Sequence, residues 1–133
     1  MLVDAQTVIT HYYAAFNAGD FAGMLGKVTD DFTHDPNQGQ RRVGKKLFSE
    51  FLSKMDRCYR EQVVDLVVMV NGSRAAAEFV INGTYLVAED GLPPAHGQAY
   101  RLPVGAFFEL RDGKIARVTN YYNLQDWLAQ VSK

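Results

Sequence analysis

The second half of the chain carries four long stretches of strand-forming residues, and this pattern constrains the fold more than any other feature. The predicted strands are Val63–Val70, Ala75–Val87, Ala99–Leu110 and Ile115–Tyr122. Two connections, Asn71-Gly72 and Asp112-Gly113, are pairs that favour tight hairpin turns. Gly83 and Gly105 interrupt two strands, and we expect bulges or bends there that curl the sheet. The sequence therefore predicts a curved antiparallel meander.

Three helical segments precede this meander. Asp4 is placed to cap the first helix, whose apolar residues, Tyr12 and Phe16 among them, recur at helical spacing, and Gly19 suits a left-handed stop. A short second helix contains Met24 and Leu25. The third is an amphipathic segment with Leu47, Phe48, Phe51, Leu52 and Met55 on its apolar side. Helices ahead of a curled sheet predict an α+β fold.

Three further segments are predicted: a short strand, a long connection and a C-terminal helical turn. We expect Asp30-Asp31 to turn the chain into a short strand, Phe32–Asp35, which Pro36 ends while holding Asp35 extended. Residues 89–97, with Pro93-Pro94, form the one long connection and suit a lid or rim. A closing helical turn is expected from Leu124, Trp127, Leu128 and Val131.

Length and composition restrict the class of protein. At 133 residues the chain fits one domain, 1–133, and 47% hydrophobic with 22% charged residues is ordinary for a globular protein. A net charge of −1 provides no field to attract nucleic acid or an anionic membrane. Cys58 is alone and no secretory signal is recognisable, so cytoplasmic residence is the default expectation.

The order of these segments resembles the ketosteroid isomerase and SnoaL-like branch of the NTF2-like superfamily over nearly the whole chain. The stretch V-I-T-H-Y-Y-A-A-F-N-A-G-D at Val8–Asp20 is similar to the opening helix of steroid delta-isomerases. H-D-P-N-Q-G at His34–Gly39, M-D-R-C-Y-R-E at Met55–Glu61 and T-N-Y-Y-N-L-Q-D-W at Thr119–Trp127 resemble a bacterial ketosteroid-isomerase-related group. The resemblance implies a cone-shaped barrel, with three N-terminal helices packed against a curved antiparallel sheet.

The resemblance also implies roles for residues. Tyr12 falls at the position of the oxyanion-binding Tyr of the isomerases, and Asp35 falls at their general base. Their second oxyanion-hole acid is replaced by Gly105, which weakens the case for steroid isomerisation by the known mechanism. Homodimerisation through the sheet face that bears Thr119 and Tyr121 is expected by the same comparison.

Each proposed catalytic residue also has a purely structural explanation. A general base at Asp35 requires enough burial to raise its pKa toward neutrality, whereas an Asx turn before Pro36 needs no such shift. Tyr12 lies on the apolar stripe, so its hydroxyl group would bond either a ligand oxygen or a neighbouring side chain. His34 alternates with Asp35 along the strand, and the two should point to opposite faces.

The ligand-binding expectations rest on the choice of sheet face. On the last strand Val118, Asn120 and Tyr122 share one face, and the comparison with the isomerases places that face in the pocket. Core packing explains each candidate equally well. The residues expected to bind ligand are Phe16, Met55, Tyr59, Tyr100, Phe107, Val118, Asn120 and Tyr122. Arg41 and Tyr100 are placed near the expected mouth, where either can replace the lost donor.

These expectations lead to two hypotheses. The first is a cofactor-free isomerase or cyclase in which Asp35 removes a proton next to the carbonyl group of a hydrophobic small molecule and Tyr12 binds the developing enolate. The second is a non-catalytic binding or dimeric assembly module on the same fold. No cluster of His, Cys and Asp has recognisable ligand spacing, so we expect no metal and no cofactor.

Overall fold

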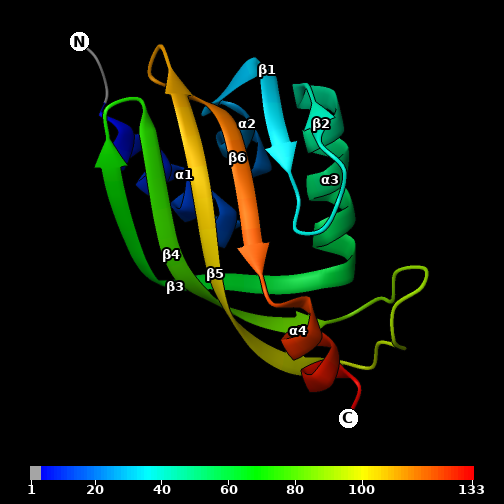
Figure 1. Cartoon of the computed structure of the whole chain (residues 1–133). Helices are drawn as coiled ribbons and strands as arrows, with labels where there is room; N and C mark the ends of the chain where they lie inside the picture. The colour runs from blue at the N-terminus through cyan, green and yellow to red at the C-terminus, as the bar shows by residue number, and fades with distance from the viewer. Residues whose placement is uncertain (1–3) are drawn as a thin grey trace.

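The computed structural model describes residues 4–133 and shows helices on one side of a single curved, unclosed sheet (Figure 1). The elements are α1 (Ala5–Ala18), α2 (Phe21–Leu25), β1 (Val28–Asp35), β2 (Arg42–Val43), α3 (Lys45–Cys58), β3 (Tyr59–Asn71), β4 (Arg74–Tyr85), β5 (Gln98–Arg111), β6 (Lys114–Tyr122) and α4 (Leu124–Val131). This arrangement confirms the predicted α+β class, with three helices ahead of the meander.

The sheet has the strand order β2-β1-β6-β5-β4-β3. The four strands β3 to β6 are neighbours in chain order and antiparallel, as predicted for the meander. β1 differs from the expected antiparallel sheet because it runs parallel to β6. The two strands are joined through α3 and the whole meander, and a connection of that length permits parallel pairing, which a hairpin does not.

The bulges of the sheet do not lie at the glycines of β4 and β5: one is in β3, and the pairing of β5 with β6 shifts between Glu109 and Leu110. The register of β3 against β4 shifts between Val64 and Val67, where Asp65 adopts a φ of 55°. A bulge of this kind bends a strand and increases its twist. The pairing of β4 with β5 continues without a shift through Gly83 and Gly105. The two glycines therefore have other roles, one of which is described below.

β1 begins earlier than predicted, at Val28, so Asp30-Asp31 lies inside the strand and not in a turn before it. The cause is the pairing with β6, in which Val28 lies opposite Ile115. Along the second half of the strand the side chains alternate between the faces, and Phe32 and His34 are buried. His34 and Asp35 consequently point to opposite sides of the sheet, as predicted.

The N-terminal helix is fixed at both ends as the sequence suggests. The Asp4 carboxylate accepts a hydrogen bond from the Thr7 backbone at 2.8 Å, and Gly19 ends α1 at a φ of 70°. Near its end, the Asn17 side chain donates to the Val63 carbonyl at 2.9 Å and accepts from the Val63 N–H at 2.7 Å. These bonds hold α1 against β3.

The predicted closing turn is the helix α4, which packs against β5. Its buried residues are Trp127 and Val131, and the Gln130 side chain bonds both backbone groups of Arg101. Within residues 4–133, none of the helices combines the length and the apolar character needed to cross a membrane.

Candidate functional site

The inner face of the sheet is the one that packs against α1 and α3, and the outer face is turned toward the viewer in Figure 1. The pairing of β1 with β6 assigns the residues of the expected site to these faces. His34 pairs with Val118, and its ring lies 4.5 Å from that of Phe51 on α3, so both belong to the inner face. Asp35 pairs with Thr119 and belongs to the outer face.

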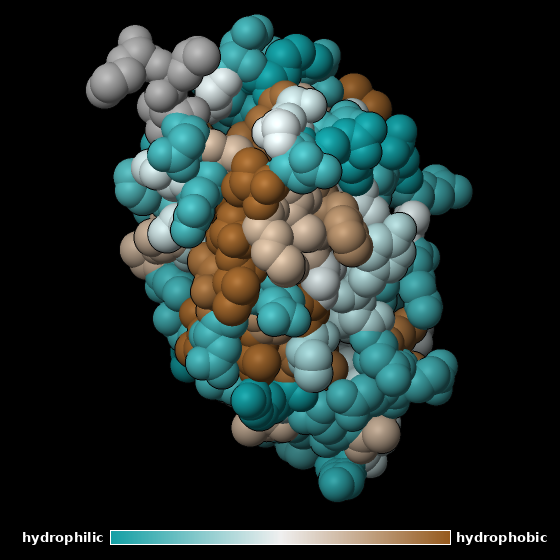
Figure 2. Space-filling model, turned by 60° about the vertical axis from the view of Figure 1, so that its left-hand side comes forward, coloured by the Kyte–Doolittle hydropathy of each residue, from teal (hydrophilic) through white to brown (hydrophobic). Residues whose placement is uncertain are grey.

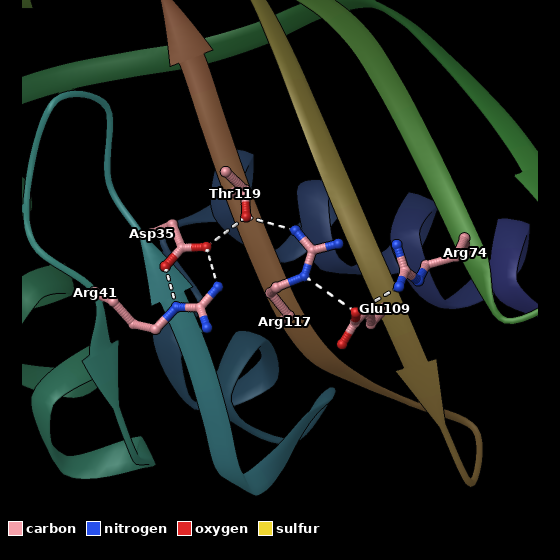
Figure 3. A network of polar contacts seen from close by, with 6 residues as sticks. All are labelled: Asp35, Arg41, Arg74, Glu109, Arg117 and Thr119. Carbon is pink, nitrogen blue, oxygen red and sulfur yellow. Dashed lines mark hydrogen bonds and ion pairs between the residues drawn. The ribbon is translucent and has the colours of Figure 1, made fainter.

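Asp35 is part of a polar network on the outer face (Figure 3). Arg41 donates two hydrogen bonds to its carboxylate, at 2.8 and 3.0 Å, and Thr119 donates a third at 2.6 Å. The bond from Arg41 is the main reason that the pKa of Asp35 lies below its ordinary value, despite an opposing effect of burial. A general base at Asp35 would need a raised pKa, and the shift here has the opposite direction.

The network continues across the sheet from Thr119. Arg117 donates to the Thr119 hydroxyl at 2.5 Å, and Glu109 lies 3.5 Å from Arg117 and 3.0 Å from Arg74. Strands β1, β6, β5 and β4 each contribute to this line of alternating charges (Figure 3). The line is a feature of the outer surface and does not extend to the helices.

Tyr12 lies on the other side of the sheet from Asp35. Its ring is buried in the core, 5.2 Å from the ring of Tyr13, and burial raises the pKa of its phenol. The sheet stands between the two residues, so the structure does not bring together the pair that the resemblance implies. The assignment of Asp35 and Tyr12 to catalysis stays a prediction.

Phe107 and Gly105 also lie on the outer face. Phe107 is 47% exposed, and its ring packs edge-on against that of Tyr121 at 5.9 Å. The inner face of β5 carries instead Tyr100, Leu102, Val104, Ala106 and Phe108, all of them buried. Phe107 therefore lies on the face opposite to the predicted one, because the alternation along β5 is offset by one residue from the assumed one.

The inner face also carries a carboxyl group, that of Glu61, which was not among the predicted site residues. Glu61 on β3 pairs with Gly83 on β4, and Gly83 pairs with Tyr100 on β5. A Cβ atom at Gly83 would lie 2.3 Å from the Tyr100 ring, so the ring covers this glycine. Across it the Tyr100 hydroxyl donates to Glu61 Oε2 at 2.5 Å. We call these two residues the Glu61–Tyr100 pair.

The surroundings of Glu61 disfavour its charge. Burial raises the pKa of the Glu61 carboxyl group, and the hydrogen bond from Tyr100 only partly opposes this effect. Burial, followed by the charge of Glu61, raises the pKa of the Tyr100 phenol, which stays a donor throughout the physiological range. A carboxyl group whose pKa is shifted toward neutrality is suited to accept and return a proton.

A second carboxyl–phenol contact fixes the connection between β4 and β5. Tyr59 donates to Glu89 at 2.5 Å, and Lys54 on α3 lies 2.6 Å from the same carboxylate. Burial acts to raise the pKa of Glu89, but the hydrogen bonds from Lys54 and Tyr59 bring it below its ordinary value. The pKa of Glu89 is thus lowered, whereas that of Glu61 is raised.

Aromatic rings surround this part of the inner face. Trp127 of α4 packs edge-on against Tyr85 at 5.0 Å, Tyr100 at 6.0 Å and Tyr59 at 6.1 Å. Tyr122, at the end of β6, is near enough to Glu61 that the carboxylate adds to the effect of burial in raising its pKa. Three residues expected to bind ligand, Tyr59, Tyr100 and Tyr122, therefore gather near Glu61.

The other expected ligand residues are on the inner side but less specifically placed. Val118 is buried, and Asn120 is half-buried on the same face of β6, as the alternation predicts. Phe16 of α1 and Met55 of α3 are both half-buried. Within the described residues, no group of three or more His, Cys, Asp or Glu side chains is arranged to hold a metal ion.

Glu61 was open to detection from sequence. It lies in the motif M-D-R-C-Y-R-E and falls on the same side of β3 as Tyr59 and the buried Val63. The predicted strand began only at Val63, so Glu61 was left outside it. Extending that strand back to Tyr59 puts a carboxyl group on its apolar side, which is a signal of function because burial of an unpaired charge is costly. The contact with Tyr100 was beyond sequence reasoning, because it depends on the register of three strands.

The comparisons with known proteins agree with this fold. The sequence matches the SnoaL-like domain family over residues 9–118. A crystal structure of a proposed polyketide cyclase from Pseudomonas putida KT2440 is 58% identical, with 93% of this chain and 95% of that chain covered and a TM-score of 0.92. One from Xanthomonas campestris is 52% identical, with 96% of each chain covered and a TM-score of 0.93.

A more distant structure supports the fold alone. A protein with a ketosteroid isomerase-like fold from Catenulispora acidiphila is 20% identical, with 93% of this chain and 91% of that chain covered and a TM-score of 0.78. No curated protein matches the sequence. The match over most of its length and the high identity to two solved structures show that this chain belongs to the SnoaL-like domain family, with the NTF2-like fold.

Proposed function

We propose that this protein is a cofactor-free enzyme of the isomerase or cyclase type, acting on a hydrophobic, carbonyl-containing small molecule at the inner face of the sheet. The Glu61–Tyr100 pair carries the proposal. It combines a carboxyl group whose pKa is raised by burial with a phenol that orients it. The names of the relatives from Pseudomonas putida and Xanthomonas campestris support the cyclase alternative.

In the proposed reaction the Glu61 carboxylate removes a proton from the carbon next to the substrate carbonyl, and the C–H electron pair moves into an enolate. An isomerase returns the proton to another carbon of the conjugated system. In a cyclase the enolate carbon attacks a second carbonyl carbon, and the proton on Glu61 passes to the new alkoxide. We assign Tyr122 to the enolate oxygen, because its phenol is near Glu61 and stays protonated.

The prediction made from sequence, with Asp35 as the base and Tyr12 as the oxyanion donor, is the direct competitor. An Asp35 carboxylate held by Arg41 on the outer face is a weak base, since its pKa is lowered. Proton removal by Asp35 would also require a ligand on the opposite side of the sheet from Tyr12. Substituting Asp35 and Glu61 one at a time shows which of the two carboxyl groups acts as the base.

The test measures proton removal without knowledge of the natural substrate. Wild-type protein is incubated in D₂O with 2-tetralone, a ketone with exchangeable protons next to its carbonyl, and mass spectrometry follows the uptake of deuterium. We expect catalysed exchange that Glu61→Gln abolishes and that Asp35→Asn leaves unchanged. Glu50→Gln, at an exposed position of α3, is the control. Exchange that depends on Asp35 and not on Glu61 would establish the competing assignment.

The outer face supports a second candidate function, that of a dimeric assembly module whose partner is a second copy of this chain. Apolar side chains form a patch on this side of the molecule, bordered by hydrophilic residues (Figure 2). The large hydrophobic residues exposed on the outer face of β3, β5 and β6 are Val67, Met69, Phe107 and Tyr121. Beside them lies the line of alternating charges in Figure 3. An exposed apolar patch bordered by polar residues is typical of a contact between subunits.

Sedimentation measurements test the dimer independently of catalysis. We expect wild-type protein to sediment as a dimer and Phe107→Asp to sediment as a monomer, because a charge would be buried in the contact. Val43→Asp, at an exposed apolar residue of the edge strand β2, is the control and should remain dimeric. Monomeric wild-type protein at all concentrations would contradict the assembly function and leave the exchange assay unaffected.

A further inference from the structure

A polar hollow of about 570 Å³ lies on the outer face of the sheet, where β3, β4 and β5 continue past the end of β6 toward α4 (Figure 1). Two rows of paired residues line it, one made of Arg60, Thr84 and Ala99 and the other of Gln62, Asn82 and Arg101. The row between them is Glu61, Gly83 and Tyr100, which also borders the hollow through its last two members. Since the side chains of Glu61 and Tyr100 point to the inner face, the two flanking rows point outward.

The hollow arises from the sizes of the side chains in these two rows. β4, the middle strand, contributes only the short side chains of Asn82 and Thr84, and Ala99 follows beside Thr84 on β5. The long side chains of Arg60 and Arg101 stand at diagonally opposite corners, on β3 and β5. The result is a floor that carries an amide and a hydroxyl group, between two guanidinium groups.

The charge of these two arginines is not compensated. Arg60 and Arg101 are exposed, and neither forms an ion pair with any of residues 4–133. No acidic residue lines the hollow. Elsewhere on the outer face, Arg74 and Arg117 are both paired with Glu109. Two unpaired cations around one hollow create a local positive potential that attracts an anion, although the net charge of the chain is −1.

The backbone that carries Arg101 is held in place from the side. β6 pairs with β5 only from Val104 onward, so the edge of β5 at Arg101 has no neighbouring strand. The Gln130 side chain of α4 takes that place: it accepts from the Arg101 N–H and donates to the Arg101 carbonyl, both at 2.9 Å. A fixed backbone reduces the entropy that a ligand must cost on binding.

We propose that this hollow binds the phosphate group of a small phosphorylated molecule, between Arg60 and Arg101 and above Asn82 and Thr84. The two arginines are two strand spacings apart across the sheet and two residues apart along it, a backbone separation on the order of 12 Å. Two arginine side chains together span this separation, so both guanidinium groups reach an anion seated over β4.

The arrangement of donors favours phosphate over carboxylate. A carboxylate has two oxygens in one plane and a single charge, which one guanidinium group can satisfy by itself. A phosphate monoester has three terminal oxygens and a charge of about −1.5 to −2 at neutral pH. It can therefore accept from both arginines and still offer an oxygen to the Asn82 amide or the Thr84 hydroxyl group. The volume of the hollow is in the range of small-molecule sites.

This site is separate from both functions proposed above. Arg60 and Arg101 are the chain neighbours of Glu61 and Tyr100, but they lie on the opposite face of the sheet. Phe107, in the apolar patch of the proposed dimer, lies about 20 Å along β5 from Arg101. A phosphorylated ligand in the hollow would therefore occupy neither the inner face nor that patch.

Isothermal titration calorimetry with phenyl phosphate tests the proposal at constant ionic strength. We expect the wild type to bind phenyl phosphate about tenfold more tightly than benzoate, and Arg60→Gln and Arg101→Gln each to weaken this binding about tenfold. Both arginines are exposed, so neither substitution removes packing from the core. Arg42→Gln, at an exposed arginine of β2 on the other edge of the sheet, makes the same change of charge and should keep the wild-type affinity. Absence of binding, equal affinity for benzoate, or an equal loss in all three variants would overturn the proposal.

The phenyl ring could also carry the probe to the inner face, so the place of binding is tested separately. Inorganic phosphate should displace phenyl phosphate, and phenol should not, because the phosphate group is the part recognised. Glu61→Gln should bind phenyl phosphate with the wild-type affinity, whatever its effect on deuterium exchange. Displacement by phenol, or loss of binding in Glu61→Gln, would place the probe on the inner face and refute the outer site, while leaving the exchange assay to decide the proposed function.

Discussion

Two carboxyl groups of this protein each accept a hydrogen bond from a hydroxyl group, yet their surroundings are opposite. Asp35 lies on the outer face, where Thr119 and the guanidinium group of Arg41 both donate to it, and its pKa is lowered. Glu61 lies on the inner face, where Tyr100 donates to it, no ion pair is formed within the described residues, and its pKa is raised.

The difference shows why a carboxyl group at a familiar sequence position does not identify a base. A cation at hydrogen-bonding distance stabilises the ionised form, while burial without a cation destabilises it. The first arrangement suits an anchor between strands and the second suits proton transfer. Substitutions on the two faces test whether the surroundings of Asp35 and Glu61 differ in this way.

Gly83→Ala should have the largest effect on stability. The added Cβ would lie 2.3 Å from the Tyr100 ring, which is buried and must move away from Glu61. We expect the free energy of unfolding to fall by about 1–3 kcal/mol, as for other overpacked cores, measured by urea denaturation.

The matched control for this change is Gly105→Ala on the outer face. An added Cβ at Gly105 has no atom within 4 Å, so the change should stay within about 0.5 kcal/mol of the wild type. Equal losses at the two glycines would contradict the close approach of Tyr100 to β4.

Tyr100→Phe should have a smaller effect, of about 1–2 kcal/mol in urea denaturation. The variant keeps the ring but removes the hydrogen bond from Tyr100 to the Glu61 carboxyl group, and a half-buried carboxyl group without that partner is unfavourable. Tyr121→Phe on the outer face is the control. Tyr121 is 58% exposed, so the hydroxyl group that this variant loses is one that water can hydrogen-bond. A loss of similar size in both variants would show that the position of Glu61 on the inner face is unimportant.

Local patterns in the sequence were sufficient to predict most of the helices, strands and turns of the fold. The hairpin turns and the cap at Asp4 were predicted because each depends on a few neighbouring residues. The parallel pairing of β1 with β6 was missed, because it joins distant segments and leaves no local pattern.

The candidate site was less predictable because it depends on which face each strand presents. Side chains alternate along a strand, so an offset of one residue moves every side chain to the other face. Alternation placed Asn120 and Tyr122 on one face of the last strand, and comparison with the isomerases identified it as the inner face, where both lie. Alignment to the isomerases placed Phe107 and Asp35 there as well, and in the structure both belong to the outer face. Such an offset cannot be detected without the register.

The smallest expected effect is the opposite dependence of stability on pH that the two carboxyl groups confer. The folded-state pKa of Asp35 lies below its ordinary value of 3.8, so its contribution is present above that pH and is lost as the pH falls through the folded-state value. Asp35→Asn should therefore cost less than about 1 kcal/mol at pH 7, after allowance for screening by solvent, and nothing at low pH.

For Glu61 the sign is reversed, because its folded-state pKa lies above the ordinary value of 4.5. The wild type is favoured below pH 4.5 and loses stability as the pH rises through the folded-state value, since the buried group must then ionise or the protein must unfold. Relative to the wild type, Glu61→Gln should gain stability as the pH rises, while Asp35→Asn loses it. Urea denaturation of both variants between pH 3 and pH 8 measures this divergence. Parallel curves would mean that the two faces hold their carboxyl groups in equivalent surroundings, which would remove the reason for assigning proton transfer to Glu61.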